Sequence, residues 1–390
     1  MFGKKRVGDI IVVQARRSKF KTNEYQTRGV LPIVDQGSDF IAGFTDESER
    51  AYEGELPLVI FGDHTCCLKY VDFRFGVGAD GTQLLRPIEG VDARYLYYAL
   101  HTAELNQYGY QRHFKLLKEC EIFVPSLETQ RRIASILGAY DDLIEVNRRR
   151  VALLEGMARG LFEEWFVRFR FPRHEAVPIV DTPDGPLPQG WAAQSLGQVA
   201  DINVASIKST NAPPEIGYID IASVSPGQID AVNWMPFVDA PGRARRVVRD
   251  GSIIWSNVRP NRRSFALVVD PAPDTIASTG FTVLDATAVS FAYLYHWVTT
   301  DKFVGYLVGN AGGAAYPAVT ATTFERADVT IPTAALMEQF TALAAPMLRQ
   351  AAILRESNKR LSASRDLLLP RLISGQLSVT AAERELEDAA

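Results

Sequence analysis

The sequence predicts an α+β chain in which two globular modules of mixed helix and strand alternate with two long helices that pair as an antiparallel coiled coil. Residues 127–169 contain no proline and carry apolar residues at alternating spacings of three and four, which is typical of a coiled-coil seam. Residues 331–379 echo that segment, and a region of short β-branched runs precedes each of the two. The chain therefore repeats one unit twice, a globule followed by a long helix.

The first globule is expected over residues 1–124. Residues 7–13, 56–61 and 65–71 have the short, β-branched and apolar character of strands, with Gly and Asp at the turns between them. Residues 93–104 are predicted to form a helix, and 121–124 an exit strand that Pro125 ends. The first long helix then occupies 125–170.

The seam of this helix has one polar position near its middle, Asn147. The seam positions are Leu137, Tyr140, Ile144, Asn147, Val151, Leu154, Ala158, Leu161 and Trp165. At 1.5 Å per residue the helix would be roughly 60 Å long, so its apolar seam needs a second helix to cover it. The distal helical region, 332–380, repeats the polar position at Asn358. In an antiparallel pair the two asparagines would meet and set the register. The alternative is two unrelated helices, each packed on its own domain.

Between the repeats lies a connector, residues 171–190, with five prolines and an Asp-Gly turn signal, which predicts a stiff, non-helical segment. The second globule, 191–331, repeats the first near its ends. Tyr293-Leu294-Tyr295 lies in a predicted helix at the place that Tyr95-Leu96-Tyr97 has in the first globule. Residues 381–390 form an acidic tail.

Composition limits the possible classes of protein. The chain has 390 residues, a net charge of −4 and three cysteines without CxxC spacing, which suits two or three domains and no disulfide framework. It contains no run of eighteen apolar residues and no small-residue cleavage site after its basic start. We therefore expect a cytoplasmic protein with no membrane partner.

Basic residues gather in two clusters, one within the first thirty residues and one between positions 243 and 263. Local clusters in a mildly acidic chain suit contacts with phosphate, although solvated surface charge would give the same pattern. The predicted DNA contacts are Arg16, Arg17, Lys19, Lys21, Gln111, Arg112, Arg243, Arg245, Arg246, Arg259, Asn261, Arg262 and Arg263.

The two helical regions resemble those of the specificity subunits of type I restriction-modification systems. The motifs that carry the resemblance are Gln130-Arg131-Arg132-Ile133-Ala134, Asn147-Arg148-Arg149, Leu161-Phe162-Glu163-Glu164-Trp165-Phe166, Leu187-Pro188-Gln189-Gly190-Trp191 and Leu368-Leu369-Pro370-Arg371-Leu372-Ile373-Ser374-Gly375. The first globule lacks the Leu-Pro-x-Gly-Trp start that the second has.

The resemblance implies separate roles for the globules, the helices and the partner subunits. Each globule would be a target-recognition domain that reads one half of a split double-stranded DNA site, and the helices would set the gap. Two methyltransferase subunits would dock on the helices, and motor-nuclease subunits would join them. Trp165, Phe166 and Phe169 exceed what a two-helix seam requires, so they would either anchor a methyltransferase subunit or pack against the adjoining globule.

No motif for covalent chemistry is found. Asn211-Ala212-Pro213-Pro214 has the wrong order for an adenine methyltransferase motif, no phosphate-binding loop of the G-x-x-x-x-G-K-[ST] type exists, and the five histidines are scattered. We expect no catalytic or metal site and no cofactor on this chain, with S-adenosylmethionine, ATP and Mg²⁺ on the partner subunits. The rival functions are a self-contained DNA methyltransferase and a coiled-coil scaffold with no DNA role.

Overall fold

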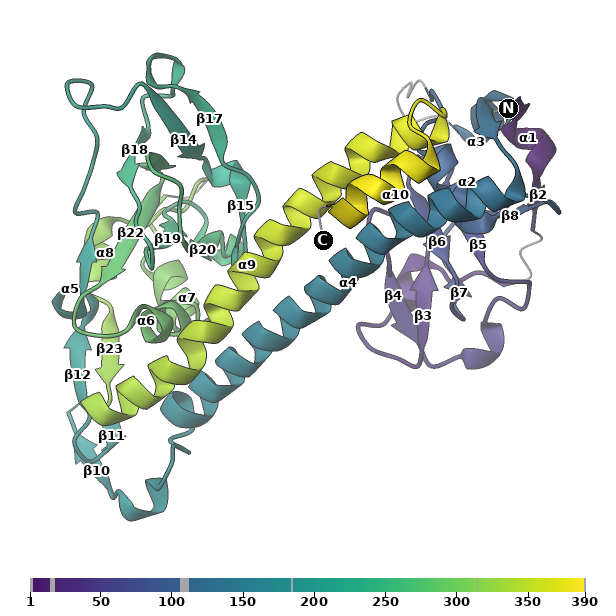
Figure 1. The fold of residues 1–390 in the computed structure, drawn as a ribbon. Coiled ribbons are helices and arrows are strands. Elements are labelled where there is room, and N and C mark those ends of the chain that lie inside the picture. Colours follow the sequence, from purple (N-terminus) through teal and green to yellow (C-terminus); the bar gives the residue numbers. More distant parts are fainter. Residues whose placement is uncertain (1–2, 15–17, 106–111, 184, 314, 389–390) are drawn as a thin grey trace. The chain divides into compact units, whose positions relative to one another are not determined.

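The structure of the protein, a computed structural model, describes residues 3–14, 18–105, 112–183, 185–313 and 315–388 (Figure 1). The chain divides into two compact units. Unit 1 consists of residues 1–147 and 357–390, and unit 2 of residues 148–356. Each unit therefore holds one globular module together with one part of each long helix.

The module of unit 1 is built on a four-stranded antiparallel sheet of order β2-β8-β5-β6 and a smaller sheet of order β4-β3-β7, in which β3 and β7 are parallel. Strand β5 is buried on both faces because it is an inner strand of its sheet and α2 packs on it. The elements are β1 (Gly3–Arg6), α1 (Val7–Ile10), β2 (Ile11–Val13), β3 (Leu31–Val34), β4 (Gly43–Thr45), β5 (Leu58–Gly62), β6 (Leu68–Val71), β7 (Gly76–Val77), β8 (Thr82–Pro87), α2 (Ala93–Leu100), α3 (Phe114–Glu119) and β9 (Glu121–Val124).

The module of unit 2 has two four-stranded sheets, of order β13-β22-β19-β20 and β17-β14-β21-β18. Its elements are β12 (Ala192–Ser195), α5 (Leu196–Val199), β13 (Ala200–Ile202), β14 (Glu215–Ile219), β15 (Val224–Ser225), β16 (Gln228–Ile229), β17 (Asn233–Pro236), β18 (Ala244–Val247), β19 (Ile253–Ser256), β20 (Phe265–Leu267), β21 (Thr275–Ser278), β22 (Phe281–Ala286), α6 (Phe291–Val298), α7 (Asp301–Gly309), α8 (Ala321–Glu325) and β23 (Asp328–Ile331).

The two modules share one strand scheme. Strand β19 pairs with β20 and β22 as β5 pairs with β6 and β8, and β14 runs parallel to β21 as β3 runs parallel to β7. The duplicated tyrosines have the same role in both, because the Tyr95 hydroxyl donates to the carbonyl of Phe123 and the Tyr293 hydroxyl to that of Thr330, each on the exit strand. These tyrosines are buried, so they belong to the cores of the two modules.

The predicted helix pair is confirmed in each unit. Helix α4 (Leu127–Phe162) and helix α9 (Ala334–Ile373) are antiparallel. In unit 1, Asn147 Nδ2 donates to Asn358 Oδ1 at 2.9 Å, and Asp141 pairs with Arg365. In unit 2, Val151 packs with Ala351 and Leu354, and Glu155 pairs with Arg355 at 2.6 Å.

We expect Asn147→Ala to lower the free energy of unfolding by about 1–3 kcal/mol. Asn147 is buried, and its loss removes the amide partner of Asn358. Replacing both asparagines with leucine should recover most of that loss, since no amide is then left without its partner. Urea unfolding of the single and double variants measures this coupling. Arg148→Ala on the exposed face serves as the control, and an equal loss there would contradict the assignment.

Two segments have more structure than the sequence indicated. Residues 171–190 contain a short 3₁₀ turn (His174–Ala176) and a hairpin of β10 (Ile179–Thr182) and β11 (Gly185–Pro188), and Phe171 and Leu187 enter the core of unit 2. The acidic tail is largely helical. Helix α10 (Val379–Asp388) buries Val379 and Ala382, which lie three residues apart on one face of the helix. Its Glu383 pairs with Arg132 at 2.5 Å.

None of the helices that the structure describes is long and apolar enough to cross a membrane.

Candidate nucleic-acid interface

The hairpin loop between β19 and β20 carries four of the predicted DNA contacts. Its middle, Pro260–Arg262, forms a 3₁₀ turn, and the flanking Arg259 and Arg263 have left-handed backbones with φ of 51° and 55°. Asn261 and Arg262 are exposed at its tip. The loop therefore presents an amide and a guanidinium, the two groups best suited to base edges, on a short turn of fixed conformation.

A second segment, residues 316–319, contacts this loop and is called the bracing segment below. The Arg259 amide donates to the carbonyl of Pro317 at 2.7 Å, and the Val319 amide donates to the carbonyl of Asn257 at 2.9 Å. The Arg259 guanidinium lies 4.7 Å from the ring centre of Tyr316, which is 69% exposed. The sequence analysis did not select Tyr316. An exposed cation–aromatic pair adds stacking to the hydrogen-bonding groups of the loop.

Two other arginines of this cluster already have acidic partners. Arg263 pairs with Asp301, and Arg243 pairs with Asp220 at 3.0 Å while donating to the Tyr218 hydroxyl at 3.1 Å. These contacts raise the pKa of Arg243. Because both ion pairs are on the surface, they are weak, and a phosphate can replace the carboxylate. Both residues suit phosphate contacts better than base contacts.

Arg245 and Arg246 differ although they are neighbours on β18. The Arg245 guanidinium lies 5.0 Å from the ring centre of Phe237 and donates to the carbonyl of Ala244 at 2.7 Å. Arg246 is half-buried, and burial lowers its pKa. The basic run 243–249 therefore does not form one continuous DNA-facing surface.

In the first module the predicted contacts are dispersed. Lys19 pairs with Asp80 at 2.6 Å, and Lys21 is exposed at the start of a short 3₁₀ turn (Thr22–Glu24). Arg112 is exposed just before α3. Arg16, Arg17 and Gln111 lie outside the described residues.

The three aromatic residues at the end of α4 pack inside unit 2. A turn of π-helix, Glu163–Val167, follows α4 and buries Trp165 and Phe166. The Phe166 ring centre lies 5.0 Å from that of Phe340 and 4.8 Å from that of Tyr293, and the half-buried Phe169 contacts Trp191. The second interpretation, packing against the adjoining globule, is therefore the one that the structure shows.

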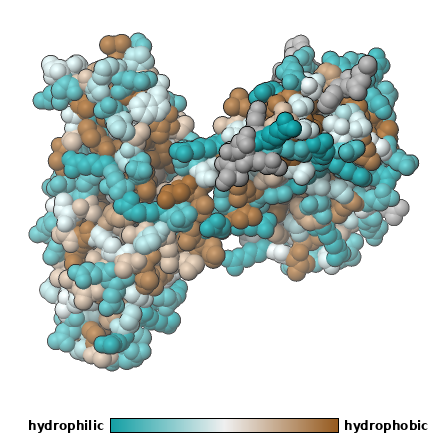
Figure 2. Space-filling view, in the orientation of Figure 1, coloured by the Kyte–Doolittle hydropathy of each residue, from teal (hydrophilic) through white to brown (hydrophobic). Residues whose placement is uncertain are grey.

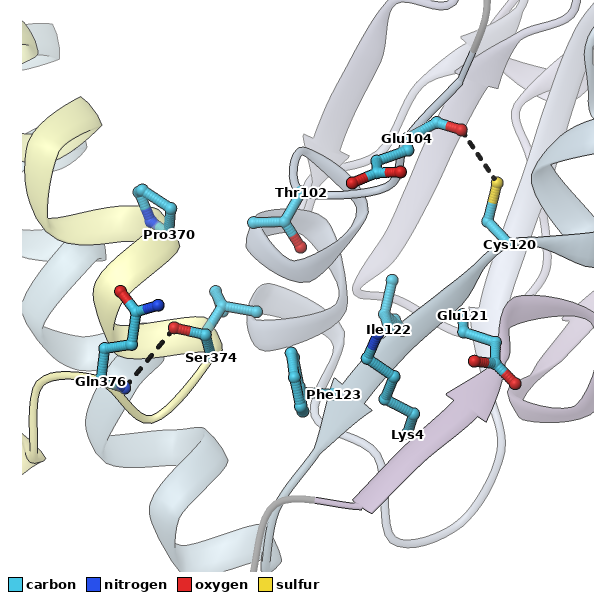
Figure 3. A pocket seen from close by; sticks show the side chains of 11 residues that line it. Lys4, Thr102, Glu104, Cys120, Glu121, Ile122, Phe123, Pro370, Ser374 and Gln376 are labelled. Atoms are coloured by element: carbon cyan, nitrogen blue, oxygen red, sulfur yellow. Dashed lines mark hydrogen bonds between the residues drawn. The ribbon is translucent and has the colours of Figure 1, made fainter.

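Unit 1 also contains a cavity of about 530 Å³ beside β9 and the end of α9 (Figure 3). Its wall combines Lys4 with Glu104 and Glu121, and Cys120 donates to the Glu104 carbonyl. None of the predicted DNA contacts that the structure describes lines it. Within the described residues there is no group of three or more His, Cys, Asp and Glu side chains placed to hold a metal ion.

Comparisons with known proteins agree with this architecture. Residues 2–155 match the family model of the type I restriction modification DNA specificity domain. The type I restriction enzyme MjaIX specificity subunit of Methanocaldococcus jannaschii is 25% identical over 320 residues, which is 77% of this chain and 72% of that protein. The HindI specificity subunit of Haemophilus influenzae is 22% identical over 146 residues, 36% of this chain and 32% of that protein.

The fold has a solved counterpart. The crystal structure of the type I restriction-modification system S subunit from M. genitalium superposes with a TM-score of 0.62 at 13% identity, covering 96% of both chains. The superposition shows that this chain shares the fold of that S subunit over nearly its whole length. Over 77% of its length the chain is thus similar to a specificity subunit of a type I restriction enzyme, and residues 2–155 match the DNA specificity domain of these systems.

Proposed function

We propose that each module reads one half of a split double-stranded DNA site and that the helix pair sets the gap between the halves. The observation that carries the proposal is the duplication, because two modules share one strand scheme and each is attached to parts of both α4 and α9. Two readers joined by a spacer of fixed length engage one duplex together, so that the spacing becomes part of the specificity.

In unit 2 the base-reading groups are Asn261 and Arg262 at the tip of the hairpin loop, with Arg259 and Tyr316 beside them. Arginine pairs with the O6 and N7 atoms of guanine, and asparagine with the N6 and N7 atoms of adenine. Arg243 and Arg263 sit in surface ion pairs and would exchange their carboxylates for phosphates, which positions the module without adding sequence information.

The long helices would also carry the partner subunits. They expose large apolar side chains outside the seam: Leu143 (46%) and Val146 (49%) in unit 1, and Leu153 (63%) and Met157 (49%) in unit 2. On the face drawn in Figure 2, hydrophobic residues are interspersed with hydrophilic ones over both units. We assign to these helical residues the docking of two methyltransferase subunits, which motor-nuclease subunits then join.

The chain itself would perform no catalysis. Adenine methylation with S-adenosylmethionine, and ATP- and Mg²⁺-dependent translocation and cleavage, would belong to the partner subunits. A self-contained methyltransferase is the rival enzyme, and tight binding of S-adenosylmethionine by the isolated chain would favour it. A scaffold without a DNA role is the rival from another class, and duplex binding that does not weaken with salt would favour that.

The test is a base-resolution map of N6-methyladenine in DNA from cells that express this chain with its methyltransferase partner. We expect a split motif that disappears when this chain alone is deleted. Arg262→Ala should relax one half of the motif at one base pair, at a cost of about 1–3 kcal/mol in discrimination, and leave the other half unchanged. Arg148→Ala, on the exposed side of α4, is the matched control. Equal damage to both halves would refute the assignment of one half to each module.

A further inference from the structure

The hairpin loops of the two modules begin on equivalent residues, Asp63 and Asn257. Asn257 directly follows β19, and its Oδ1 accepts a hydrogen bond from the Thr282 hydroxyl on β22 at 2.6 Å. Asp63 directly follows β5, and its Oδ2 accepts from Gln83 Nε2 on β8 at 3.4 Å. Thr282 is the second residue of β22 and Gln83 the second of β8. The two anchors therefore occupy one position in the shared strand scheme.

The bracing segment is duplicated as well. In unit 2 the Val319 amide donates to the carbonyl of Asn257, shortly before α8. In unit 1 the His113 amide donates to the carbonyl of Asp63 at 2.8 Å, directly before α3. The Asp63 carboxylate also accepts from the Phe114 amide at 2.9 Å. It is buried and engaged, so it is held inside the module rather than presented to a phosphate backbone.

The loop of unit 1 is shorter and presents different side chains. Between Asp63 and β6 it contains only His64, Thr65, Cys66 and Cys67. Gln36 holds this loop in place through two hydrogen bonds. Its side-chain Oε1 accepts from the His64 amide at 3.2 Å, and its backbone carbonyl accepts from the Thr65 hydroxyl at 2.5 Å. Gln36 is itself held, because its Nε2 donates to the carbonyl of Asp80 at 2.7 Å. A turn held in this way keeps its side chains in one place, which base recognition requires.

We infer that the β5–β6 hairpin, with His64 and Thr65 at its tip and Arg112 beside it, is the surface with which the first module reads base edges. This inference rests on the proposed function and assigns it to residues that the basic cluster at the start of the chain does not include. Arg112 directly precedes the bracing residue His113 and is exposed. It provides the cation near this loop that the arginines provide in unit 2.

The bonding of Thr65 specifies what it reads. Its hydrogen is donated to Gln36, and one lone pair accepts from the Cys67 amide at 3.3 Å. A hydroxyl oxygen has two lone pairs, so Thr65 retains one acceptor on its exposed side chain. In the major groove the donors are the exocyclic amino groups of adenine and cytosine. Thr65 therefore suits an amino-bearing base, and His64 and Arg112 suit the acceptors N7 and O6 of a neighbouring purine.

The experiment uses the full complex and the N6-methyladenine map. Thr65→Val should relax the preference for an adenine or cytosine at one base pair of one half-site by about 10- to 100-fold, whereas Thr65→Ser, which keeps the hydroxyl, should preserve it. His64→Ala and Arg112→Ala should affect the same half-site. That half must be the one that Arg262→Ala leaves intact. Arg74→Ala, which alters an exposed cation of the same module outside both the hairpin and the predicted DNA contacts, should change neither half.

The outcomes separate this inference from the proposed function. If the unaltered complex yields no split motif, the proposed function fails before any variant is compared. If Arg262→Ala relaxes one half while Thr65→Val and His64→Ala leave the other half intact, the function stands and the hairpin assignment is overturned. A change produced by Arg74→Ala in place of the hairpin variants would likewise overturn it. Thermal unfolding of each purified variant confirms that a changed motif reflects contacts and not a lost fold.

Discussion

Phe162→Ala should lower the free energy of unfolding of unit 2 by about 3–5 kcal/mol, since removal of a fully buried aromatic ring leaves a cavity. Phe162 is 0% exposed and joins three elements. Its ring centre lies 5.5 Å from those of Tyr293 and His296 on α6 and 6.1 Å from that of Phe340 on α9. The ring is therefore a central contact between the module of unit 2 and its parts of the helix pair.

The measurement is urea unfolding followed by tryptophan fluorescence, which reports on unit 2 because Trp165, Trp191, Trp234, Trp255 and Trp297 all lie there. Leu153→Ala is the control on the same helix and in the same unit. Its side chain is 63% exposed, so it should cost less than about 0.5 kcal/mol. Similar losses in both variants would show that Phe162 has no special role in this packing.

Unit 2 should lose stability in mild acid because of His296. This residue is 2% exposed, neither ring nitrogen has a hydrogen-bond partner among the described residues, and the ring packs against Phe162 and Phe340. Burial, together with the nearby Arg159 guanidinium, holds the pKa of His296 well below 6.5. In the unfolded chain the imidazole takes up a proton as the pH falls below about 6.5, whereas in the folded unit it does not.

The sign of the effect follows from that difference. The contribution of His296 is fully present above about pH 6.5 and is lost as the pH falls, by up to about 1.4 kcal/mol per pH unit until the folded-state pKa is reached. His296→Leu should remove this dependence. It should also raise the stability at pH 7.5 by about 1–3 kcal/mol, because an unsatisfied buried N–H is replaced by an apolar group.

Unfolding curves of the His296→Leu variant and the unaltered chain at pH 7.5, 6.5 and 5.5 measure this difference. His101 in unit 1 has a pKa lowered by burial, so a His101→Leu variant separates its part from that of His296. Parallel pH profiles for the His296→Leu variant and the unaltered chain would contradict the prediction.

The sequence predicted the repeated organisation well, because a periodic pattern over a long segment does not depend on the identity of any single residue. The seam of α4, the Asn147–Asn358 pair and the duplicated Tyr95 and Tyr293 all follow from spacing alone. The sequence did not predict that the aromatic residues at the end of α4 pack inside unit 2. An apolar stripe shows which face of a helix is buried, but not which part of the protein covers that face. Trp165 and Phe166 continue the stripe of the helix, yet a turn of π-helix directs them into the module.

The DNA-contact residues were harder to predict for a related reason. Neighbouring arginines on β18 differ in their partners, since Arg245 lies against Phe237 and Arg246 reaches Ser206, so a basic run in sequence is not a basic surface. Tyr316 joins Arg259 across more than fifty residues of sequence, and the Asp63 hairpin has no arginine to mark it. Only the pairing of β5 with β8, and of β19 with β22, places Asp63 and Asn257 in one register.

The division of the chain also determines an order of folding. Unit 2 is one continuous stretch, 148–356, whereas unit 1 joins residues 1–147 to residues 357–390. During synthesis the first module must wait for the distal part of α9, on the order of tens of seconds at ribosomal speeds. Meanwhile the seam residues of the first half of α4, such as Leu137 and Ile144, lack their intramolecular cover. The nascent chain therefore exposes an apolar seam until residues 357–390 are made and complete the first unit.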